Sequence, residues 1–382
     1  MKNAYDIIII GGGIVGCSLA FELARRGRKD ILIIEKEYLT SGATGRCGAG
    51  VRHQWGTALN IQLARDSIRI LENLNEYTGY EKDCGLRQGG YLILAYTETE
   101  WEQFNKNYEL QRSLGVPVEK LDPIGAKDIV PHLNTEGLIG AMFCGKDGFT
   151  DPFHCTFAYA KGAKRMGVDI VTYTEVIGIN IDNEKITGVK TTKGTFYSNM
   201  VINATGGHAP QIMQMVGLDI PIFPERHPIL VTEAVNHIQD PMIISFFHRF
   251  YCQQTPHGSF VMGIGDPNEP VSYNIKANWS FLELCTSKIL NTLPVLKDIR
   301  LVRQWAGLYD MTPDRNQIID EAEGVSGLYT IAGFSGHGFM VAPKTSIIFA
   351  QHLCGEKEDI DISLFSAKRY KTGELLLEPS VV

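Results

Sequence analysis

The first 35 residues carry the clearest pattern of apolar and polar positions in the chain. An apolar run of strand length, Asp6–Ile10, ends in three glycines, and apolar residues then recur at helical spacing over Ile14–Arg26. Gly27 closes that helix, and a second short β-branched run follows at Asp30–Glu35. The order strand, glycine turn, helix, strand predicts a parallel strand pair with a right-handed crossover, which begins a doubly wound sheet.

The same periodicities predict further elements along the chain. Helices are expected at Ala58–Tyr77, Glu98–Leu114, Asp151–Met166, Trp279–Leu290 and about Val341–Leu353. Strands are expected at Gly90–Tyr96, Asp169–Val171, Thr174–Ile181, Ile229–Val235, Ser259–Gly265 and from Leu328, with a turn at Asp182–Asn183. The glycine-rich segment Ser41–Gly50 predicts a loop wrapped on a ligand.

The distribution of these elements predicts an α/β chain, α+β overall, with two domains. Strand–helix units lie at the beginning, middle and end, and antiparallel-looking strands lie between them. We therefore expect a Rossmann-like nucleotide-binding domain made of discontinuous segments, with a second domain inserted. The expected boundaries are 1–85, 141–215 and 318–382 for the first domain, and 86–140 and 216–317 for the second.

Composition narrows the possible classes of function. Apolar residues make up 44% and charged residues 21%, which is typical of a globular protein. The net charge of −7 argues against a nucleic-acid binder. The chain has no apolar run long enough for a membrane helix, and its N-terminal apolar stretch is too short for a signal peptide. The eight cysteines include no CxxC pair, so we expect no metal site and a cytoplasmic location.

The strongest chemical signal is a GxGxxG pattern formed by Gly11, Gly13 and Gly16. Gly11 permits the tight turn, Gly13 lets a pyrophosphate approach the backbone, and Gly16 lets helix and strand pack. Glu35 ends the second strand, where a carboxylate accepts ribose hydroxyls. The motif alone leaves a flavin and a nicotinamide open. Its expected cofactor-binding residues are Gly11, Gly13, Ile14, Val15, Gly16, Glu35 and Lys36.

Three other segments are candidates for the same ligand. Each also has a plainer interpretation, as a solvated loop, a sheet-end turn or a packed turn histidine. A helix N-terminus after the last segment would stabilise an anionic reduced flavin. The candidates are Thr44, Gly45, Arg46, Gly50 and Val51 in the first segment, Ala204, Thr205 and Gly206 in the second, and Gly333, Gly336, His337, Gly338, Phe339 and Met340 in the third.

Five motifs in order carry a family resemblance. They are GGGIVG near the start, GATGRCGAGVRHQWG at Gly42–Gly56, GKDGFTDPF at Gly145–Phe153, RQWAGLYDMTPD at Arg303–Asp314 and AGFSGHGFMVAP at Ala332–Pro343. With them the sequence resembles the D-amino-acid oxidase superfamily, nearest to the β-subunits of heterotetrameric sarcosine oxidase and dye-linked L-proline dehydrogenase. The resemblance implies an FAD-binding domain and a substrate domain with a large mixed, mostly antiparallel sheet. It also implies oxidation of an amino-acid C–N bond with hydride transfer to flavin N5.

The resemblance also implies roles for individual residues. Arg52 matches the arginine that grips the substrate carboxylate, and His53 lies beside it, facing the flavin. Tyr309 matches a tyrosine lining the substrate pocket, and Tyr251 is a weaker match to another. Val176 resembles the valine whose backbone meets the adenine. With Met340, the implied catalytic set is Arg52, His53, Tyr251, Tyr309 and Met340.

Departures from the family pattern refine these expectations. Gly307 stands where monomeric sarcosine oxidases attach FAD through a cysteine, so non-covalent FAD is implied. Val261 and Met340 replace two lysines of those oxidases, which favours a dehydrogenase. The stretch Asp151–His154 matches the FMN region of the heteromeric enzymes, which leaves FMN at an interface with a partner α-subunit open. Sarcosine, proline and glycine remain alternative substrates. A glycine or D-amino-acid oxidase, a nicotinamide dehydrogenase and a non-catalytic flavin-holding subunit remain alternative functions.

Overall fold

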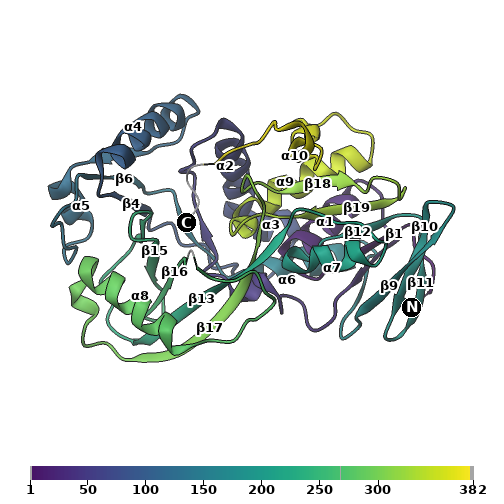
Figure 1. Cartoon of the computed structure of the whole chain (residues 1–382), viewed down its shortest axis with the longest axis horizontal. Helices are drawn as coiled ribbons and strands as arrows, with labels where there is room; N and C mark the ends of the chain where they lie inside the picture. The colour runs from purple at the N-terminus through teal and green to yellow at the C-terminus, as the bar shows by residue number, and fades with distance from the viewer. Residues whose placement is uncertain (1, 267, 379–382) are drawn as a thin grey trace.

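Two large sheets divide the chain into halves that lie side by side (Figure 1). The structure is a computed structural model that describes residues 2–266 and 268–378. The right half of the view combines purple, teal and yellow segments, so it draws on the start, the middle and the end of the chain. The left half holds mainly blue and green segments. Segments far apart in the sequence therefore lie side by side in the right half.

The sheet of the right half has six strands and is parallel except at one edge, where β18 pairs antiparallel with β19. Ile7 and Ile9 pack with helices, whereas Ile8 and Ile10 pack with a smaller sheet. Burial on both faces explains why the central strands are unbroken apolar runs. The strand order is β18 (Ile318–Glu321), β19 (Leu328–Ala332), β12 (Val201–Asn203), β1 (Ile7–Ile10), β2 (Ile31–Ile34) and β8 (Asp169–Val171).

Helices cover one face of this sheet, whereas three short strands and α7 (Ala209–Gln214) cover the other. α1 packs against both α6 and α9, and α9 also contacts α2. The helices are α1 (Ile14–Arg25), α2 (Ala58–Glu72), α3 (Leu74–Thr78), α6 (Pro152–Arg165), α7 (Ala209–Gln214), α9 (Gly338–Leu353) and α10 (Arg369–Thr372). The three strands are β9 (Val176–Asp182), β10 (Lys185–Thr191) and β11 (Gly194–Tyr197).

The left half is an eight-stranded mixed sheet in which only β14 and β4 are parallel neighbours. This confirms the expected mostly antiparallel sheet. The order is β17 (Leu301–Met311), β13 (Phe223–Ala234), β16 (Ser259–Ile264), β15 (Phe250–Gln254), β14 (Met242–Ser245), β4 (Tyr91–Ala95), β6 (Gly140–Cys144) and β5 (Glu119–Leu121). Its helices are α4 (Glu98–Ser113), α5 (Pro123–Ile129) and α8 (Trp279–Thr292).

The two faces of the eight-stranded sheet belong to different cores. Leu92 and Ile243 lie in the core that includes α8, whereas Tyr91 and Ile244 join the core of the six-stranded half. Because side chains alternate along a strand, paired residues of neighbouring strands share a face. We call the face that carries Tyr91 and Ile244 the inner face. It is the face that meets the six-stranded half.

Several expected boundaries need correction. The helix expected at Ala58–Tyr77 is two helices, α2 and α3, which meet at Asn73. The turn between β9 and β10 is at 183–184, one residue later than expected, and both of its residues have positive φ, as a two-residue hairpin turn requires. α9 begins at Gly338 and not near Val341, so the glycine segment is shorter than expected.

The sheets also bear on the domain division. All six strands of the parallel sheet fall within 1–85, 141–215 and 318–382. However, β6 pairs with β4 and β5 in the other sheet, although most of it lies after residue 140. We therefore propose the same division with that boundary moved to follow Cys144. Among the residues that the structure describes, no helix is long and apolar enough to cross a membrane.

Candidate flavin and substrate site

The glycine turn brings three backbone segments into close contact. A Cβ on Gly11 would lie 2.4 Å from the carbonyl oxygen of Ala204, and one on Gly16 would lie 2.1 Å from that of Gly11. Gly11 also has a φ of 115°, a conformation that favours glycine. α1 starts at Ile14 with no side-chain cap from Gly13, so its first N–H groups face the turn. This is the arrangement that binds an anion at a helix N-terminus.

Glu35 lies buried beside this turn. Its Oε2 accepts a hydrogen bond from the Gly12 N–H at 2.8 Å, and its Oε1 accepts one from the Ser41 hydroxyl at 3.2 Å. Val176 begins β9 nearby, since the N–H of Thr174 donates to the Glu35 carbonyl at 2.9 Å. The structure thus brings the expected ribose carboxylate, the glycine turn and the expected adenine valine into one region.

The loop at 41–50 connects the turn to the eight-stranded sheet. Thr44 Oγ1 accepts a hydrogen bond from the Ile14 N–H at 3.1 Å, at the start of α1. Arg46 points elsewhere: its guanidinium donates to the carbonyl of Ala306 at 3.3 Å, and Trp305 Nε1 donates to the Arg46 carbonyl at 2.9 Å. Thr44 therefore lies at the start of α1, where a phosphate group is expected, whereas the hydrogen bonds of Arg46 connect the loop to β17.

The remaining expected residues of these segments lie around the same place. The Ala204 N–H donates to the Ile10 carbonyl at 2.9 Å, and the Thr205 hydroxyl donates to Asn203 at 2.7 Å. Lys36 is exposed, and its Nζ lies 3.4 Å from Nε2 of His208. Gly45 follows Thr44 in the one-turn helix Ala43–Arg46, Gly206 begins another at Gly206–His208, and Gly50 and Val51 form β3, paired with β7 (Gly148–Phe149).

The C-terminal glycine segment places His337 at the start of α9. The ring is buried, lies 4.9 Å from the Trp55 ring, and has no hydrogen-bond partner on either nitrogen among the described residues. Burial, aided by the charge of Arg52, lowers the pKa of His337 to about 3. Buried polar atoms normally have partners. Two unpartnered nitrogens beside a helix N-terminus therefore fit a bound polar group such as a flavin edge.

The C-terminal glycine segment contacts the end of β17 at two places. Asp310 Oδ2 accepts a hydrogen bond from the Gly333 N–H at 2.7 Å, and burial raises the pKa of Asp310 to about 6. A Cβ on Gly336 would lie 2.2 Å from the Tyr309 ring. Phe339 and Met340 follow Gly338 in the first turn of α9. Asp310 is not among the residues expected from the sequence, although it lies within the motif RQWAGLYDMTPD.

Arg52 is a buried cation directly after β3. Its Nη1 donates to the Gln54 carbonyl at 2.8 Å, and its Cζ lies 3.9 Å from the Trp55 ring centre. Burial lowers the pKa of Arg52, but a guanidinium remains protonated in proteins. Tyr91 and Tyr309 are close enough to influence its charge. Arg52 thus lies where the 41–50 loop meets the inner face of the sheet.

Two tyrosines and a glutamine of the inner face pack against the same loop. A Cβ on Gly48 would lie 3.7 Å from both the Tyr251 ring and the Gln253 amide, and Gln253 Nε2 donates to the Gly48 carbonyl at 2.8 Å. A Cβ on Gly50 would lie 1.8 Å from the Tyr91 hydroxyl. The glycines of the loop therefore let the two halves approach where the substrate tyrosines are expected.

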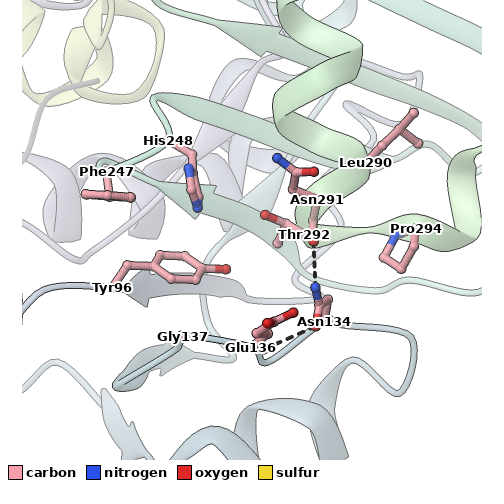
Figure 2. A pocket seen from close by; sticks show the side chains of 10 residues that line it. All are labelled: Tyr96, Asn134, Glu136, Gly137, Phe247, His248, Leu290, Asn291, Thr292 and Pro294. Atoms are coloured by element: carbon pink, nitrogen blue, oxygen red, sulfur yellow. Dashed lines mark hydrogen bonds between the residues drawn. The ribbon is translucent and has the colours of Figure 1, made fainter.

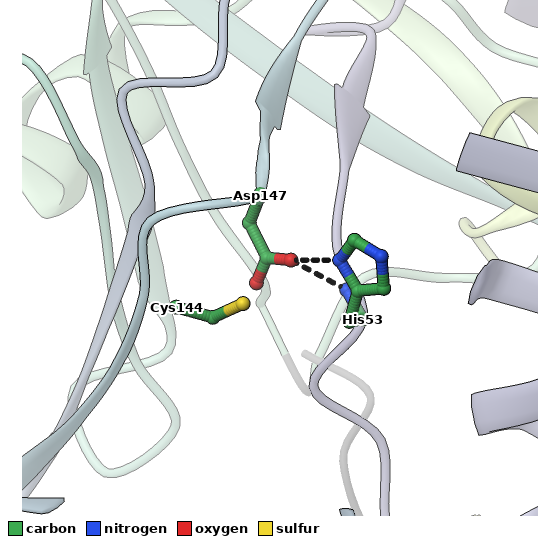
Figure 3. Close-up of side chains that lie close together, drawn as sticks. All are labelled: His53, Cys144 and Asp147. Atoms are coloured by element: carbon green, nitrogen blue, oxygen red, sulfur yellow. Dashed lines mark hydrogen bonds and ion pairs between the residues drawn. The ribbon is translucent and has the colours of Figure 1, made fainter. Parts of the chain in front are cut away.

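His53 is held in a buried hydrogen-bond centre (Figure 3). Asp147 Oδ1 accepts hydrogen bonds from the His53 N–H and pairs with its Nδ1, both at 2.7 Å, and Oδ2 accepts one from Gln54 Nε2 at 2.9 Å. Cys144 completes the group, and burial raises the pKa of its thiol. These pairings fix the two residues that follow Arg52. Asp147 is not among the residues expected from the sequence, although it belongs to the motif GKDGFTDPF.

His227 is a further residue near this site that was not expected from the sequence. Its ring stacks on that of Tyr309, with centres 3.6 Å apart and planes at 9°, and its Nε2 lies 2.9 Å from Glu225 Oε1. The signal available in the sequence was the alternation Glu225, His227 in a strand, which puts both side chains on one face.

A separate hollow of about 530 Å³ lies on the other side of the eight-stranded sheet (Figure 2). The rings of Tyr96, Phe247 and His248 line one side of it, and the end of α8 lines another. None of the residues expected at the flavin or substrate site lines it.

Comparisons with known proteins agree with this site. A family model described as FAD dependent oxidoreductase matches residues 6–352. The sarcosine oxidase subunit beta of Arthrobacter sp. is 29% identical over 385 residues, covering 99% of this chain and 94% of that protein. The glycine oxidase of Geobacillus kaustophilus is 28% identical over 377 residues, covering 97% and 98%. The crystal structure of L-proline dehydrogenase from P. horikoshii is 37% identical with a TM-score of 0.92, covering 98% of this chain and 100% of that one.

These findings confirm the resemblance and the fold class, and they identify FAD as the cofactor. The glycine turn, the buried Glu35 and the unpartnered His337 are the features of the chain that fit this cofactor. On the match over 6–352 and the similarity to the P. horikoshii enzyme, the chain is a member of the FAD-dependent oxidoreductase family.

Proposed function

We propose that this chain is a dehydrogenase that oxidises the C–N bond of a small amino acid, a secondary or N-methyl amine such as proline or sarcosine. When bound, FAD supplies the hydride acceptor. The observation that carries the proposal is the buried Arg52, a cation held where the loop 41–50, which we call the cofactor loop, meets the inner face. Relatives named proline dehydrogenase, sarcosine oxidase and glycine oxidase all act on amino acids, which carry a carboxylate.

In this proposal Arg52 binds the substrate carboxylate. A guanidinium donates two parallel hydrogen bonds, which set the direction of a carboxylate as well as its position. The Trp55 ring and the Gln54 carbonyl hold the guanidinium in place. Tyr251 and Tyr309 would line the space beside it, and the buried surroundings exclude water and strengthen each polar contact. Orientation of this kind contributes about 7–11 kcal/mol to rate acceleration.

Two positions support a dehydrogenase over an oxidase. Val261 is a buried residue of β16, and Met340 lies in the first turn of α9. Neither carries the charge of the lysines found in monomeric sarcosine oxidases. A lysine ammonium stabilises reduced oxygen species, so its absence from both positions favours another electron acceptor.

A partner subunit is part of the proposal. Two relatives are named as beta subunits of sarcosine oxidase, which implies that they assemble with other subunits. The stretch expected to border FMN opens α6, where Asp151 caps the helix and His154 Nδ1 lies 2.9 Å from the Tyr80 hydroxyl. We propose that FMN, if bound, lies at this end of α6 against an α-subunit. The eight free cysteines favour a reducing compartment such as the cytoplasm.

An anaerobic flavin-bleaching screen tests the function. The FAD-loaded protein is mixed with sarcosine, L-proline, hydroxyproline, glycine and opines, with and without a co-expressed α-subunit. We expect bleaching of the flavin absorbance by at least one secondary or N-methyl amino acid and none by pyrrolidine, which lacks the carboxylate. Failure of all of them to bleach the flavin would identify a flavin-holding subunit. Reduction of NAD by a colourless protein would identify a nicotinamide enzyme.

A further inference from the structure

The proposed reaction needs a proton acceptor. A free amino acid carries an ammonium group at neutral pH, and hydride leaves the adjacent carbon only when the nitrogen lone pair is free. Arg52 remains protonated, and His337, with a pKa near 3, is too weak a base to take the proton. Tyr309 and Tyr251, whose pKa values burial raises, are protonated as well. His53, the remaining histidine expected near the substrate, is paired through Nδ1 with Asp147 in a separate buried hydrogen-bond centre.

We propose that His227 accepts the ammonium proton of the substrate, with Glu225 orienting its ring. This inference rests on the proposed function. It assigns a catalytic residue that neither the sequence motifs nor the cofactor segments contain.

The strand register places His227 on the inner face. His227 is paired with Gly307, and Glu225 is paired with Tyr309. A Cβ on Gly307 would lie 3.2 Å from Cβ of Arg46, so this row of the sheet faces the cofactor loop. The His227 ring lies flat against one face of Tyr309, and the edge of that tyrosine meets the backbone of Gly336, at the start of α9. His227 is therefore next to the tyrosine that the family resemblance places at the substrate.

Its hydrogen bonding leaves one ring nitrogen available. Nε2 lies 2.9 Å from Glu225 Oε1, so the neutral ring donates its proton there and keeps a lone pair on Nδ1. No described protein atom hydrogen-bonds Nδ1. The Glu225 carboxylate would also stabilise the imidazolium that forms, as in other carboxylate–histidine pairs that transfer protons.

The step balances as a proton transfer. An N–H bond of the substrate ammonium breaks, the proton forms a bond to Nδ1 of His227, and the electron pair stays on the substrate nitrogen. The amine is then neutral and its α- or N-methyl carbon can lose hydride. The imidazolium is paired with Glu225 until it releases the proton to water after product leaves.

Titratable and charged groups from several elements surround His227. Glu225 lies on its own strand, Tyr309 on β17, and Arg46 and Cys47 on the loop. Burial raises the pKa of Cys47 to about 11. Asp310, whose pKa is raised to about 6 by burial, titrates near neutrality beside Tyr309. A pH dependence from Asp310 would persist in a His227 variant, which separates the two.

The test measures the limiting rate of anaerobic flavin bleaching by L-proline between pH 6 and 10. His227→Phe keeps a ring to stack on Tyr309 but accepts no proton, and Glu225→Gln removes the countercharge. We expect His227→Phe to bleach at least about 100-fold more slowly at pH 7 and to recover as the free amine fraction rises. His227→Ala should regain rate with added imidazole. His237→Gln is the control, because His237 forms a similar pair with Asp240 on the exposed surface.

A carboxylate without an amine separates proton transfer from structural damage. Tetrahydro-2-furoate resembles proline but has no N–H, and its binding is read from the flavin spectrum. We expect its affinity for His227→Phe to stay within about threefold of wild type. A His227→Phe enzyme with the wild-type rate and pH profile would overturn the proposal. So would a parallel loss of tetrahydro-2-furoate affinity with no recovery at high pH. Absence of bleaching in the wild type would instead refute the proposed function itself.

Discussion

At the scale of single residues, the site depends on buried polar groups whose surroundings set their charge. Arg52 and His337 lie close enough that the charge of Arg52 lowers the pKa of His337, and burial lowers the pKa of both groups. The guanidinium stays charged because its ordinary pKa is very high, whereas the imidazole becomes neutral. The result is one fixed cation beside one neutral ring.

The role proposed for Arg52 predicts a loss of substrate binding. Arg52→Lys keeps the charge but loses the planar pair of donors, so KM for L-proline should rise by the equivalent of about 1.5–3 kcal/mol. Steady-state kinetics with a dye acceptor measure it. Arg69→Lys, in an exposed position on α2, is the matched control and should leave KM unchanged. An unchanged KM in Arg52→Ala would show that the carboxylate binds elsewhere.

The low pKa of His337 predicts an acid-sensitive fold. The unfolded chain binds a proton at this histidine below about pH 6.5, and the folded chain does so only near pH 3, so stability falls as the pH drops between them. His337→Phe removes the titrating group and therefore this contribution to the pH dependence of stability. Urea unfolding of the apoprotein at pH 5 and 7.5 should show wild type losing up to about 2 kcal/mol more than the variant. His237→Phe, at an exposed histidine, should behave like wild type.

At the scale of elements, the glycines of the C-terminal segment set how α9 meets the sheet. Gly336 has a φ of 89° and leaves no room for a Cβ beside Tyr309. Gly355, which follows α9, also has positive φ but has nothing within 4 Å of its Cβ position. A side chain at either position would therefore strain the backbone, but only at Gly336 would it also collide with a neighbouring side chain.

This contrast predicts the effect of two alanine substitutions. Gly355→Ala should cost only the backbone strain, about 1 kcal/mol. Gly336→Ala should destabilise by about 1–3 kcal/mol more, because the added methyl displaces the Tyr309 ring. Thermal or urea unfolding of both variants measures the difference, and the flavin spectrum should change in Gly336→Ala alone. An equal loss of stability in the two variants would mean that the Tyr309 ring moves aside without cost.

A buried ion pair connects the end of β17 to α10. Asp314 and Arg369 are both buried, with Arg369 Nε 2.6 Å from Oδ2 and Nη2 3.1 Å from Oδ1. Burial alone would raise the pKa of Asp314, but the hydrogen bonds and charge of Arg369 hold it below its usual value. The ion pair therefore contributes fully to the stability of the fold above about pH 4. This contribution is lost as the pH falls through the lowered pKa that Asp314 has in the folded chain.

Removing one partner of this ion pair should strongly lower the stability of the fold. Asp314→Ala leaves a buried guanidinium without its countercharge, so unfolding free energy at pH 7 should fall by about 3–5 kcal/mol. Chemical denaturation measures it. The exposed pair Lys371–Glu323 supplies the comparison, and Glu323→Ala should be indistinguishable from wild type. A small effect of Asp314→Ala would show that the C-terminal segment contributes little to folding.

At the scale of the whole molecule, the cofactor loop lies between the two sheets. Thr44 contacts the start of α1, whereas Arg46 bonds to β17, five or fewer residues before Tyr309 and Asp310. A ligand that contacts the glycine turn and His337 would therefore tie together segments far apart in sequence. Binding to the folded chain alone stabilises it by mass action.

We therefore expect FAD to stabilise the apoprotein. At 100 times its Kd, FAD should raise the unfolding free energy by about 2.7 kcal/mol, seen as a higher Tm in a thermal scan. NAD at the same concentration should leave Tm unchanged. A shift with NAD and none with FAD would contradict the assignment of the cofactor.

The sequence determined much of the nucleotide-binding half because its signals are local. The glycine spacing, the helix after it and the acidic residue ending the next strand all lie within 35 residues and need no long-range contact to be read. The helices expected at Glu98–Leu114 and Asp151–Met166 followed from apolar spacing in the same way, and the structure has them as α4 and α6. The break at Asn73 and the start of α9 at Gly338 were missed, because the exact ends of a helix depend on local cap geometry and not on apolar periodicity.

Only the tertiary structure decided which side chains meet. His227 and Tyr309 are 82 positions apart, and Asp147 and His53 are 94 apart, so their pairing follows from strand register and not from any local pattern. The strand β6 likewise joined the second sheet through pairing with β4. Local sequence fixes backbone preference and which face is apolar, whereas contacts between distant strands depend on the register of the assembled sheet.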